Sequence, residues 1–398
     1  MSKKYFIAII AAAILCLSFL IPQISMGQTD DTDKEALASR LVNECAGIKE
    51  GDLVVVYGGV RDLTLLEDIC VNVRKKGAFP LLTIGSDRMS RRMYIDVPVE
   101  YDSQLPAFNY EMAKVIDAII SVDFSETEDL LSDIPPERFD TRSAAAAEIN
   151  NLMMQRNVKT ISLGNGLYPT KMLAALFAMN LDDLTKLFWE GVNVDYALLN
   201  KNCTSLKNTL STAKAMHVTN DDGTDFTVQI EGRPIFISDG VISETDFETG
   251  GAACQVWLPA GEIYLTPVPG TANGTVVVKR QYFSGKEIDN LKLIFTDGKL
   301  TDMSADNNLE VLRKYYDACG GAKDRLGIID FGMNPNIAIS PENKLVCWVA
   351  EGMITLGVGN NEWAGGNNET SFFMANFLPG STVSLDGKVI IDKGKLVD

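Results

Sequence analysis

The sequence predicts a two-domain protein, with an N-terminal α/β domain of the Rossmann-like type followed by a C-terminal α+β domain. Up to about residue 205, short apolar runs alternate with amphipathic stretches, which is typical of a parallel sheet covered by helices on both faces. Beyond that point, turn residues separate successive strand patterns, as in antiparallel sheets. We place an export signal and the two domains at residues 1–27, 28–205 and 206–398.

The first half begins with a predicted helix over residues 33–48, whose apolar side chains share one face. A buried strand over 53–57 ends at Gly58-Gly59, and a second helix over 61–76 ends near Gly77. The remaining elements predicted in this half are strands 80–84, 118–122 and 160–163, and helices 141–156 and 170–190.

The second half opens with a polar helix over 195–214, and antiparallel strands follow it. The strands are predicted at 225–230, 235–238, 262–266, 274–279 and 291–295. A helix over 306–318 comes next, and we assign no element to the Gly-rich stretch that runs from there to the C-terminus.

The N-terminus resembles an export signal. A basic start is followed by an apolar run from Tyr5 to Ile21, and small residues at Ser25 and Gly27 suit cleavage after Gly27. At about 17 residues, the run is at the short end for a membrane span, so an uncleaved anchor is the alternative interpretation. We expect an exported protein, periplasmic or extracellular, with no stable membrane span after cleavage.

Composition excludes several classes of function. The net charge of −17 argues against a nucleic-acid-binding surface, which needs a basic face. The chain has one histidine, His217, so it holds neither an HExxH zinc motif nor any site with two imidazole ligands. His217 lies in an alternating stretch that resembles the start of a strand, where a packed or surface histidine is expected rather than a catalytic one.

Six cysteines remain after the signal, and none of them forms a CxxC pair. An exported protein is able to form disulfides, but Cys70, Cys254 and Cys347 have apolar neighbours that equally suit buried free thiols. The sequence leaves both alternatives open.

Short motifs of the second half resemble the aminopeptidase T family, the thermophilic-type two-metal metalloaminopeptidases. They are Gly-Thr-Asp-Phe-Thr (223–227) with Gly232-Arg233, Leu-Pro-Ala-Gly-Glu-Ile-Tyr (258–264), the Leu-Gly to Asn-Pro segment (326–335), Leu356-Gly357, and Gly-Gly-Asn-Asn (365–368). Each motif is weak alone, but they occur in order. The resemblance implies a metalloaminopeptidase-like C-terminal domain and a homodimer.

The resemblance also implies a two-metal centre of two glutamates, two histidines and an aspartate, with a tyrosine nearby. Glu262 matches one glutamate. The tyrosine position holds Asn360, and the other four ligand positions hold apolar residues, namely Ile328, Met353, Phe373 and Ala375. Without metal, buried and unpaired polar ligands would each cost about 1–3 kcal/mol, whereas these apolar residues fill the space. We therefore assign no catalytic residue and expect Glu262 to need another partner, such as Arg233 or a backbone amide, or to have a raised pKa.

Three hypotheses follow. In the first, the protein has no metal cofactor and binds a small peptide or amine in an apolar cleft. We expect the lost ligand positions to line this cleft (Ile328, Met353, Asn360, Phe373 and Ala375), with Glu262 as its polar group. In the second, it is an enzyme in which other carboxylates (Asp330, Glu351 or Glu369) hold a divalent metal (Mg, Mn, Ca or Zn) beside Glu262. A variant with methionine ligands would use Met333, Met353 and Met374. In the third, it is a structural protein whose important surface lies elsewhere.

Overall fold

The structure is a computed structural model that describes residues 33–127, 130–340 and 342–397. The predicted export signal lies outside the described residues. Within them, no helix is both long enough and apolar enough to cross a membrane.

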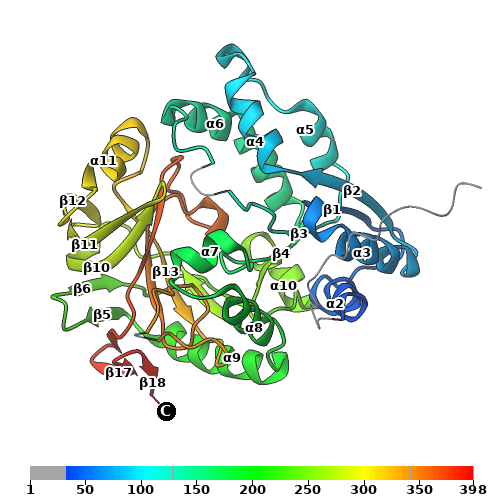
Figure 1. Ribbon diagram of the computed structural model, residues 1–398. Helices are drawn as coiled ribbons and strands as arrows, with labels where there is room; N and C mark the ends of the chain where they lie inside the picture. The colour runs from blue at the N-terminus through cyan, green and yellow to red at the C-terminus, as the bar shows by residue number, and fades with distance from the viewer. Residues whose placement is uncertain (1–32, 128–129, 341, 398) are drawn as a thin grey trace, which may run out of the picture. The chain divides into compact units, whose positions relative to one another are not determined.

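A parallel sheet forms in the first half, as predicted (Figure 1). In the described part of the chain its strands lie in the order β2 (Phe79–Gly85), β1 (Leu53–Gly59), β3 (Ala118–Val122), β4 (Lys159–Leu163) and β8 (Gln255–Leu258). Every adjacent pair is parallel. Strand β8 comes from beyond residue 205, so the chain returns to this sheet after it has already formed β5, β6 and β7 of the antiparallel part.

Helices cover both faces of the parallel sheet. Val54 and Val56 face the large core together with Leu66 and Ile69 of α3 (Leu63–Lys75). Val55 faces the opposite way and packs in a small cluster with residues of the α5 and α6 helices. The helices of this half are α2 (Lys34–Arg40) with a π-helical turn (Leu41–Cys45), α3, α4 (Asp87–Ile95), α5 (Ala107–Ala113), α6 (Pro136–Gln155), α7 (Lys171–Leu176), α8 (Leu181–Val192) and α9 (Tyr196–Thr212).

The single helix predicted over 170–190 is wrong, because the chain breaks it into α7 and α8. Ala178 lies between them with φ +53°, in the left-handed region that ends a helix. Asn180 then caps α8, since its side-chain oxygen accepts the backbone N–H of Asp183 at 2.8 Å. Asn180 is the local signal for the new helix.

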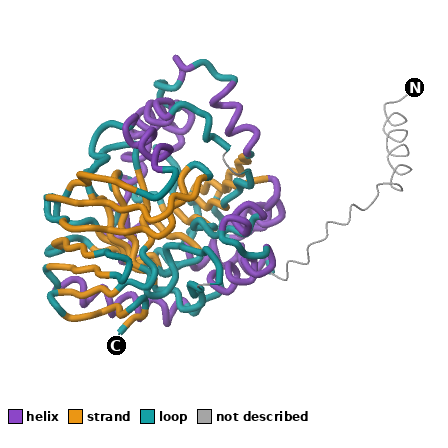
Figure 2. The backbone as a smooth tube through the Cα atoms, turned by 60° about the vertical axis from the view of Figure 1, so that its left-hand side comes forward, coloured by secondary structure: helices purple, strands orange, loops and turns teal. Residues whose placement is uncertain are grey.

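The second half builds two antiparallel sheets, and α10 (Glu244–Thr249) and α11 (Leu309–Ala318) accompany them. The first antiparallel sheet has, among the described residues, the order β12 (Lys299–Ser304), β11 (Lys286–Thr296), β10 (Asn273–Phe283), β6 (Asp225–Gln229), β5 (Ala215–Thr219), β16 (Thr382–Leu385), β17 (Lys388–Asp392) and β18 (Lys395–Leu396). The second has the order β15 (Phe373–Phe377), β14 (Ile354–Gly359), β13 (Leu326–Gly332), β9 (Glu262–Leu265) and β7 (Ile235–Ser238). In Figure 2 the strands gather in the body of the structure and helices lie along its outside.

The Gly-rich stretch to which the sequence assigned no element is instead rich in strands, from β13 to β18. Strands β13 and β14 are buried along their whole length, so they lack the alternating pattern that reveals a half-exposed strand. Glycine is needed here for close packing: a Cβ on Gly359 would lie 2.1 Å from the backbone oxygen of Phe372. The glycines therefore mark the interior of a sheet rather than a loop.

The six cysteines within the described residues are free thiols. Cys70 is half-buried and the others are buried. Of the two alternatives that the sequence left open, the structure has the buried thiols.

Candidate functional site

A cavity of about 270 Å³ is lined by residues of both the parallel sheet and the second antiparallel sheet. They come from the ends of β4 and β8, from β9 and β13, and from the segments before and after β14. The lining residues are Asn165, Trp257, Glu262, Tyr264, Asp330, Trp348 and Trp363. Two carboxyl groups and three tryptophans thus meet in one place.

Strand register places the two carboxyl groups on one face of the sheet. Asp330 on β13 lies opposite Tyr264 of β9, and Gly332 lies opposite Glu262. Because alternate residues of a strand point to the same side, Glu262, Tyr264 and Asp330 share a face. On the other neighbouring strand, Thr355 of β14 lies opposite Asp330 and shares that face as well.

Glu262 is buried, with 4% of its surface exposed. Its Oε1 accepts a hydrogen bond of 2.9 Å from the side-chain amide of Asn165, which lies in the turn after β4. Burial raises the pKa of Glu262 to about 7, although the hydrogen bond from Asn165 opposes the shift. The raised pKa expected for a desolvated carboxyl is therefore present.

Asp330 has fewer hydrogen-bond partners than Glu262 among the described residues. It is 2% exposed, and its Oδ1 has no hydrogen-bond partner among the described residues. Burial raises the pKa of Asp330 well above its ordinary value, and the charge of Glu262 adds to the shift. Beside it, the Thr355 hydroxyl oxygen is also buried without a partner in the described part of the chain. The pair therefore resists carrying two negative charges unless a positive group enters the cavity.

Aromatic rings form the walls. Trp257 and Trp363 meet edge to face with centroids 5.7 Å apart, and Tyr264 lies 5.7 Å from Trp257 and 5.6 Å from Trp363. Trp348 stacks on Phe373 at 6.3 Å. The three tryptophans are only partly buried, so part of each ring stays accessible beside the carboxyl groups.

Polar contacts outside the cavity fix two of these walls. The Gln255 side-chain amide donates to the backbone oxygen of Trp363 at 2.9 Å, which ties the turn carrying Trp363 to β8. The Tyr264 hydroxyl donates to the backbone oxygen of Ala252 at 3.0 Å. The aromatic walls are thus held in place by the protein itself.

Apolar side chains fill the sheet surface next to the carboxyl pair. Ile328 is fully buried in a cluster with Tyr264, and Phe373 packs against the same cluster. Both side chains occupy the space above Gly357, where an added Cβ would lie 2.3 Å from Ile328 Cγ2 and 2.9 Å from the Phe373 ring. Ala375 lies opposite Gly357 on β15. These three residues therefore lie on the carboxyl-bearing face.

None of the five positions expected to line the pocket is among the cavity-lining residues, and two of them lie elsewhere in the fold. Met353 is buried in the main core. The Asn360 side-chain amide bonds Glu362 Oε2 at 3.0 Å and the backbone oxygen of Thr370 at 3.1 Å, within its own loop. Arg233, one partner considered for Glu262, donates to the Thr266 backbone oxygen instead, at 3.0 Å.

His217 lies on β5, as its pattern predicted, and is exposed. Its Nε2 is 2.7 Å from Asp225 Oδ1 on the neighbouring strand β6. It does not line the cavity, so the chain's one imidazole is not placed to act as a general base there.

Comparison with known proteins identifies the family. A family model described as thermophilic metalloprotease (M29) matches residues 30–340. The chain belongs to this family. No match was found among curated proteins. Wild-type AmpT from Thermus thermophilus is similar in structure, with a TM-score of 0.68, 17% sequence identity, and coverage of 92% of this chain and 99% of that one.

A second structural neighbour is a 2,5-dihydroxypyridine dioxygenase from Pseudomonas putida KT2440, with a TM-score of 0.59 and 13% identity over 92% of this chain and 96% of that one. At such identities both likenesses show the fold alone. They confirm the two-domain architecture that the sequence predicted.

Metalloprotease membership implies a divalent metal, and the side chains present do not fit the two-metal centre that the family resemblance describes. Within residues 33–127, 130–340 and 342–397, no group of three or more His, Cys, Asp and Glu side chains is placed to hold a metal ion. Of the carboxylates considered as replacements, Asp330 lies in the cavity, whereas Glu351 and Glu369 are exposed and do not line it. The methionines considered as soft ligands, Met333, Met353 and Met374, are buried in the core.

Sequence reasoning missed most of the cavity lining. Asn165 belongs to a Gly-Asn-Gly turn that the sequence shows plainly but that matches no nucleotide motif. The tryptophans were one signal, because three of the chain's four line the cavity: Trp257, Trp348 and Trp363. Their convergence depends on the pairing of distant strands.

Proposed function

We propose that this M29 chain uses its cavity to bind a small organic ammonium group, such as an amine or the N-terminus of a short peptide, and does not hydrolyse peptides with two metals. The observation that carries the proposal is the presence of two buried carboxyl groups and three tryptophans in one cavity. The ligand class follows from what each part of that lining attracts.

The carboxyl pair attracts a positive charge. Glu262 and Asp330 are both buried and both have raised pKa values, so ionising them in the empty cavity is costly. A bound ammonium group would favour the charged forms and would supply a donor to Asp330 Oδ1, which has no partner among the described residues. Binding would therefore satisfy a buried polar atom as well as neutralise charge.

The tryptophans favour an organic cation over a hydrated metal ion. A cation over the face of a tryptophan gains about 0.5–2 kcal/mol, with the larger values in desolvated sites. A metal ion such as Mg²⁺ asks instead for six oxygen ligands and keeps its waters. At roughly 30 Å³ per water molecule, the cavity of about 270 Å³ has room for about nine water-sized groups, which suits a small ligand.

One observation supports a second candidate, a metal-dependent hydrolase. Asp330 lies on the same sheet face as Glu262, so these two carboxylates and the Asn165 oxygen are the groups that a single hard cation would use. The two candidates predict opposite results for metal content, and the same purified protein tests both.

We also propose that the protein is exported and works as a homodimer. Export rests on the basic start, apolar run and small residues that precede Gln28. The dimer rests on the family resemblance alone. Size-exclusion chromatography with light scattering would test the dimer, and the N-terminal sequence of the secreted protein would test cleavage after Gly27.

Calorimetric titration with n-propylammonium, tetramethylammonium and leucinamide tests the proposed function, with n-propanol as the uncharged control. We expect the ammonium compounds to bind and propanol to bind at least tenfold more weakly. Glu262→Gln should weaken ammonium binding at least tenfold, and Trp363→Ala should weaken it by a factor of about 2 to 30, the range of a cation–π contact. Affinity should rise with pH through about 7, where Glu262 loses its proton.

Two exposed residues provide matched controls. Glu351→Gln makes the same chemical change as Glu262→Gln at an exposed position, and Phe108→Ala removes an aromatic ring that is 73% exposed. Neither should change ammonium binding. Propanol that binds as tightly as propylammonium would refute the proposal. One or two equivalents of metal per chain by elemental analysis, with a peptidase activity that a chelator abolishes, would establish the hydrolase instead.

A further inference from the structure

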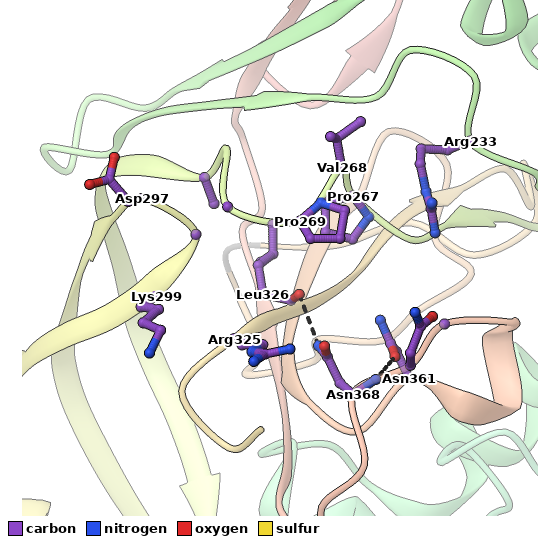
Figure 3. A pocket seen from close by; sticks show the side chains of 15 residues that line it. Arg233, Pro267, Val268, Pro269, Asp297, Lys299, Arg325, Leu326, Asn361 and Asn368 are labelled. Atoms are coloured by element: carbon purple, nitrogen blue, oxygen red, sulfur yellow. Dashed lines mark hydrogen bonds between the residues drawn. The ribbon is translucent and has the colours of Figure 1, made fainter. Parts of the chain in front are cut away.

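A second and larger cavity lies near the opposite ends of the strands that carry the carboxyl pair. Its volume is about 340 Å³, and Figure 3 shows the side chains that line it. It lies beside the start of β13 and the segment after β9, whereas Glu262 starts β9 and Asp330 is near the end of β13. The two cavities share no lining residue.

Cationic side chains outnumber carboxylates in this lining. Arg233, Lys299 and Arg325 contribute to it, and Asp297 is the one acidic residue among the lining side chains of the described chain. The chain as a whole carries 53 acidic against 36 basic residues, so the local balance is the reverse of the overall one. A cavity of this kind attracts an anion.

Two of the cations are available to a ligand. Arg325 is exposed, and across the described residues its guanidinium has neither an ion pair nor a hydrogen bond to the protein. Arg233 is held by Thr266, because its Nε donates to the backbone oxygen at 3.0 Å and its Nη2 donates to the hydroxyl. That leaves Arg233 Nη1 in a fixed position and without a hydrogen bond to any residue that the structure describes. Lys299 Nζ is 3.5 Å from Asp324 and is therefore partly neutralised.

The walls are fixed before any ligand arrives. Pro267 and Pro269 restrict the backbone of the segment after β9. On the other side, the loop that follows β14 is pinned by Asn361 and Asn368. Asn368 donates from its backbone N–H to Asn361 Oδ1 at 2.8 Å and from its side-chain amide to the backbone oxygen of Leu326 at 3.2 Å. Both bonds are drawn in Figure 3. A rigid cavity loses little entropy on binding.

We propose that this cavity binds a small organic carboxylate, with the carboxylate on Arg325 and Arg233 and the apolar body against the proline segment. Guanidinium groups match a planar carboxylate, which they bind with paired hydrogen bonds. Pro267, Val268, Pro269 and Leu326 give the cavity an apolar wall that a bare phosphate ion would leave unused. The proposal does not depend on the ammonium site.

Titration with hexanoate tests the proposal, with hexanol as the uncharged control and inorganic phosphate as the bare anion. We expect hexanoate to bind at least tenfold more tightly than hexanol and than phosphate, and to bind more weakly as salt is added. Arg325→Gln should weaken hexanoate binding at least fivefold. Lys286→Gln removes one exposed positive charge in the β10–β11 turn, away from the cavity, and should change it by less than twofold.

The outcomes separate clearly. Equal binding of hexanol and hexanoate would refute an anion site, and equal effects of the Arg325 and Lys286 variants would show that only net charge matters. Phosphate that binds as tightly as hexanoate would overturn the assignment to an organic carboxylate. Propylammonium binding should stay unchanged in Arg325→Gln, so failure of one site leaves the other open to its own test.

Discussion

Replacing Glu262 by glutamine should make the protein more stable above neutral pH while it weakens ammonium binding at least tenfold. Burial raises the pKa of Glu262 from 4.5 to about 7 in the folded protein. A carboxyl of this kind contributes its full stability below pH 4.5, where both states hold the proton. That stability is lost as the pH rises to about 7, because the unfolded chain ionises first. At about 1.4 kcal/mol for each tenfold change, the loss is roughly 3 kcal/mol.

Glutamine avoids this loss because it never ionises. Its side-chain oxygen can keep the hydrogen bond from Asn165, and its amide offers a donor toward Asp330. Urea unfolding of wild type and Glu262→Gln should therefore differ by roughly 3 kcal/mol in favour of the variant at pH 8.5, and by under about 1 kcal/mol at pH 5. With about 2 cal/mol/K per residue of unfolding entropy, the melting temperature should rise by about 4 °C at the higher pH.

Glu351→Gln is the matched control, because it removes a carboxylate that is exposed. It should change stability by less than about 0.5 kcal/mol at either pH. A Glu262→Gln protein no more stable than wild type at pH 8.5 would refute the reasoning, since ionised Glu262 would then have a stabilising partner. If Glu262→Gln is more stable but still binds propylammonium as tightly as wild type, the reasoning about the buried charge holds and the proposed role of Glu262 in binding is wrong.

Two further predictions concern the same face of the sheet. Ile328→Ala should lower the free energy of unfolding by about 2–5 kcal/mol, as measured by urea denaturation, because it opens a cavity beside Phe373 where the fully buried isoleucine was; a loss below about 1 kcal/mol would mean that the site collapses freely. Asn165→Ala should raise the pKa of Glu262 further, because its hydrogen bond favours the charged carboxylate; NMR titration of the carboxyl carbon would show this, and an unchanged or lower pKa would contradict it.

Local sequence patterns predicted the four parallel strands of the first half of the fold. Strands β1 to β4 are runs of apolar residues separated by helices with one apolar face, and both features depend on neighbours along the chain. Two helices of this half, α4 and α5, were not predicted. Large side chains on these two helices, including Met89, Met93 and Phe108, are exposed, so no apolar face directed to the core reveals them.

The candidate site was harder to predict because it is assembled by pairing of distant strands. Glu262 was found from a motif, but Asp330 becomes its neighbour only through the β9–β13 register, and Trp363 reaches it through a turn tied to β8. A register shift of one residue would turn the Asp330 side chain to the opposite face of the sheet, which packs on the main core. Sequence spacing alone does not fix that register, so the acidic pair could be suggested but not established.

If the proposed function is right, the arrangement of charge would suit an organic cation better than the family's metals. Asp330 lies two residues beyond Ile328 on one strand, which keeps the carboxyl on the same face but moves it about 7 Å along the sheet. The face thus still presents two acidic groups that need a positive partner, while the surface over Gly357 is filled by Ile328 and Phe373. A divalent metal would need several more oxygen or nitrogen ligands than these, whereas an ammonium group needs only the carboxyl pair and aromatic surface. Two buried acids without further metal ligands among the described residues are therefore what the proposed organic-cation site would need.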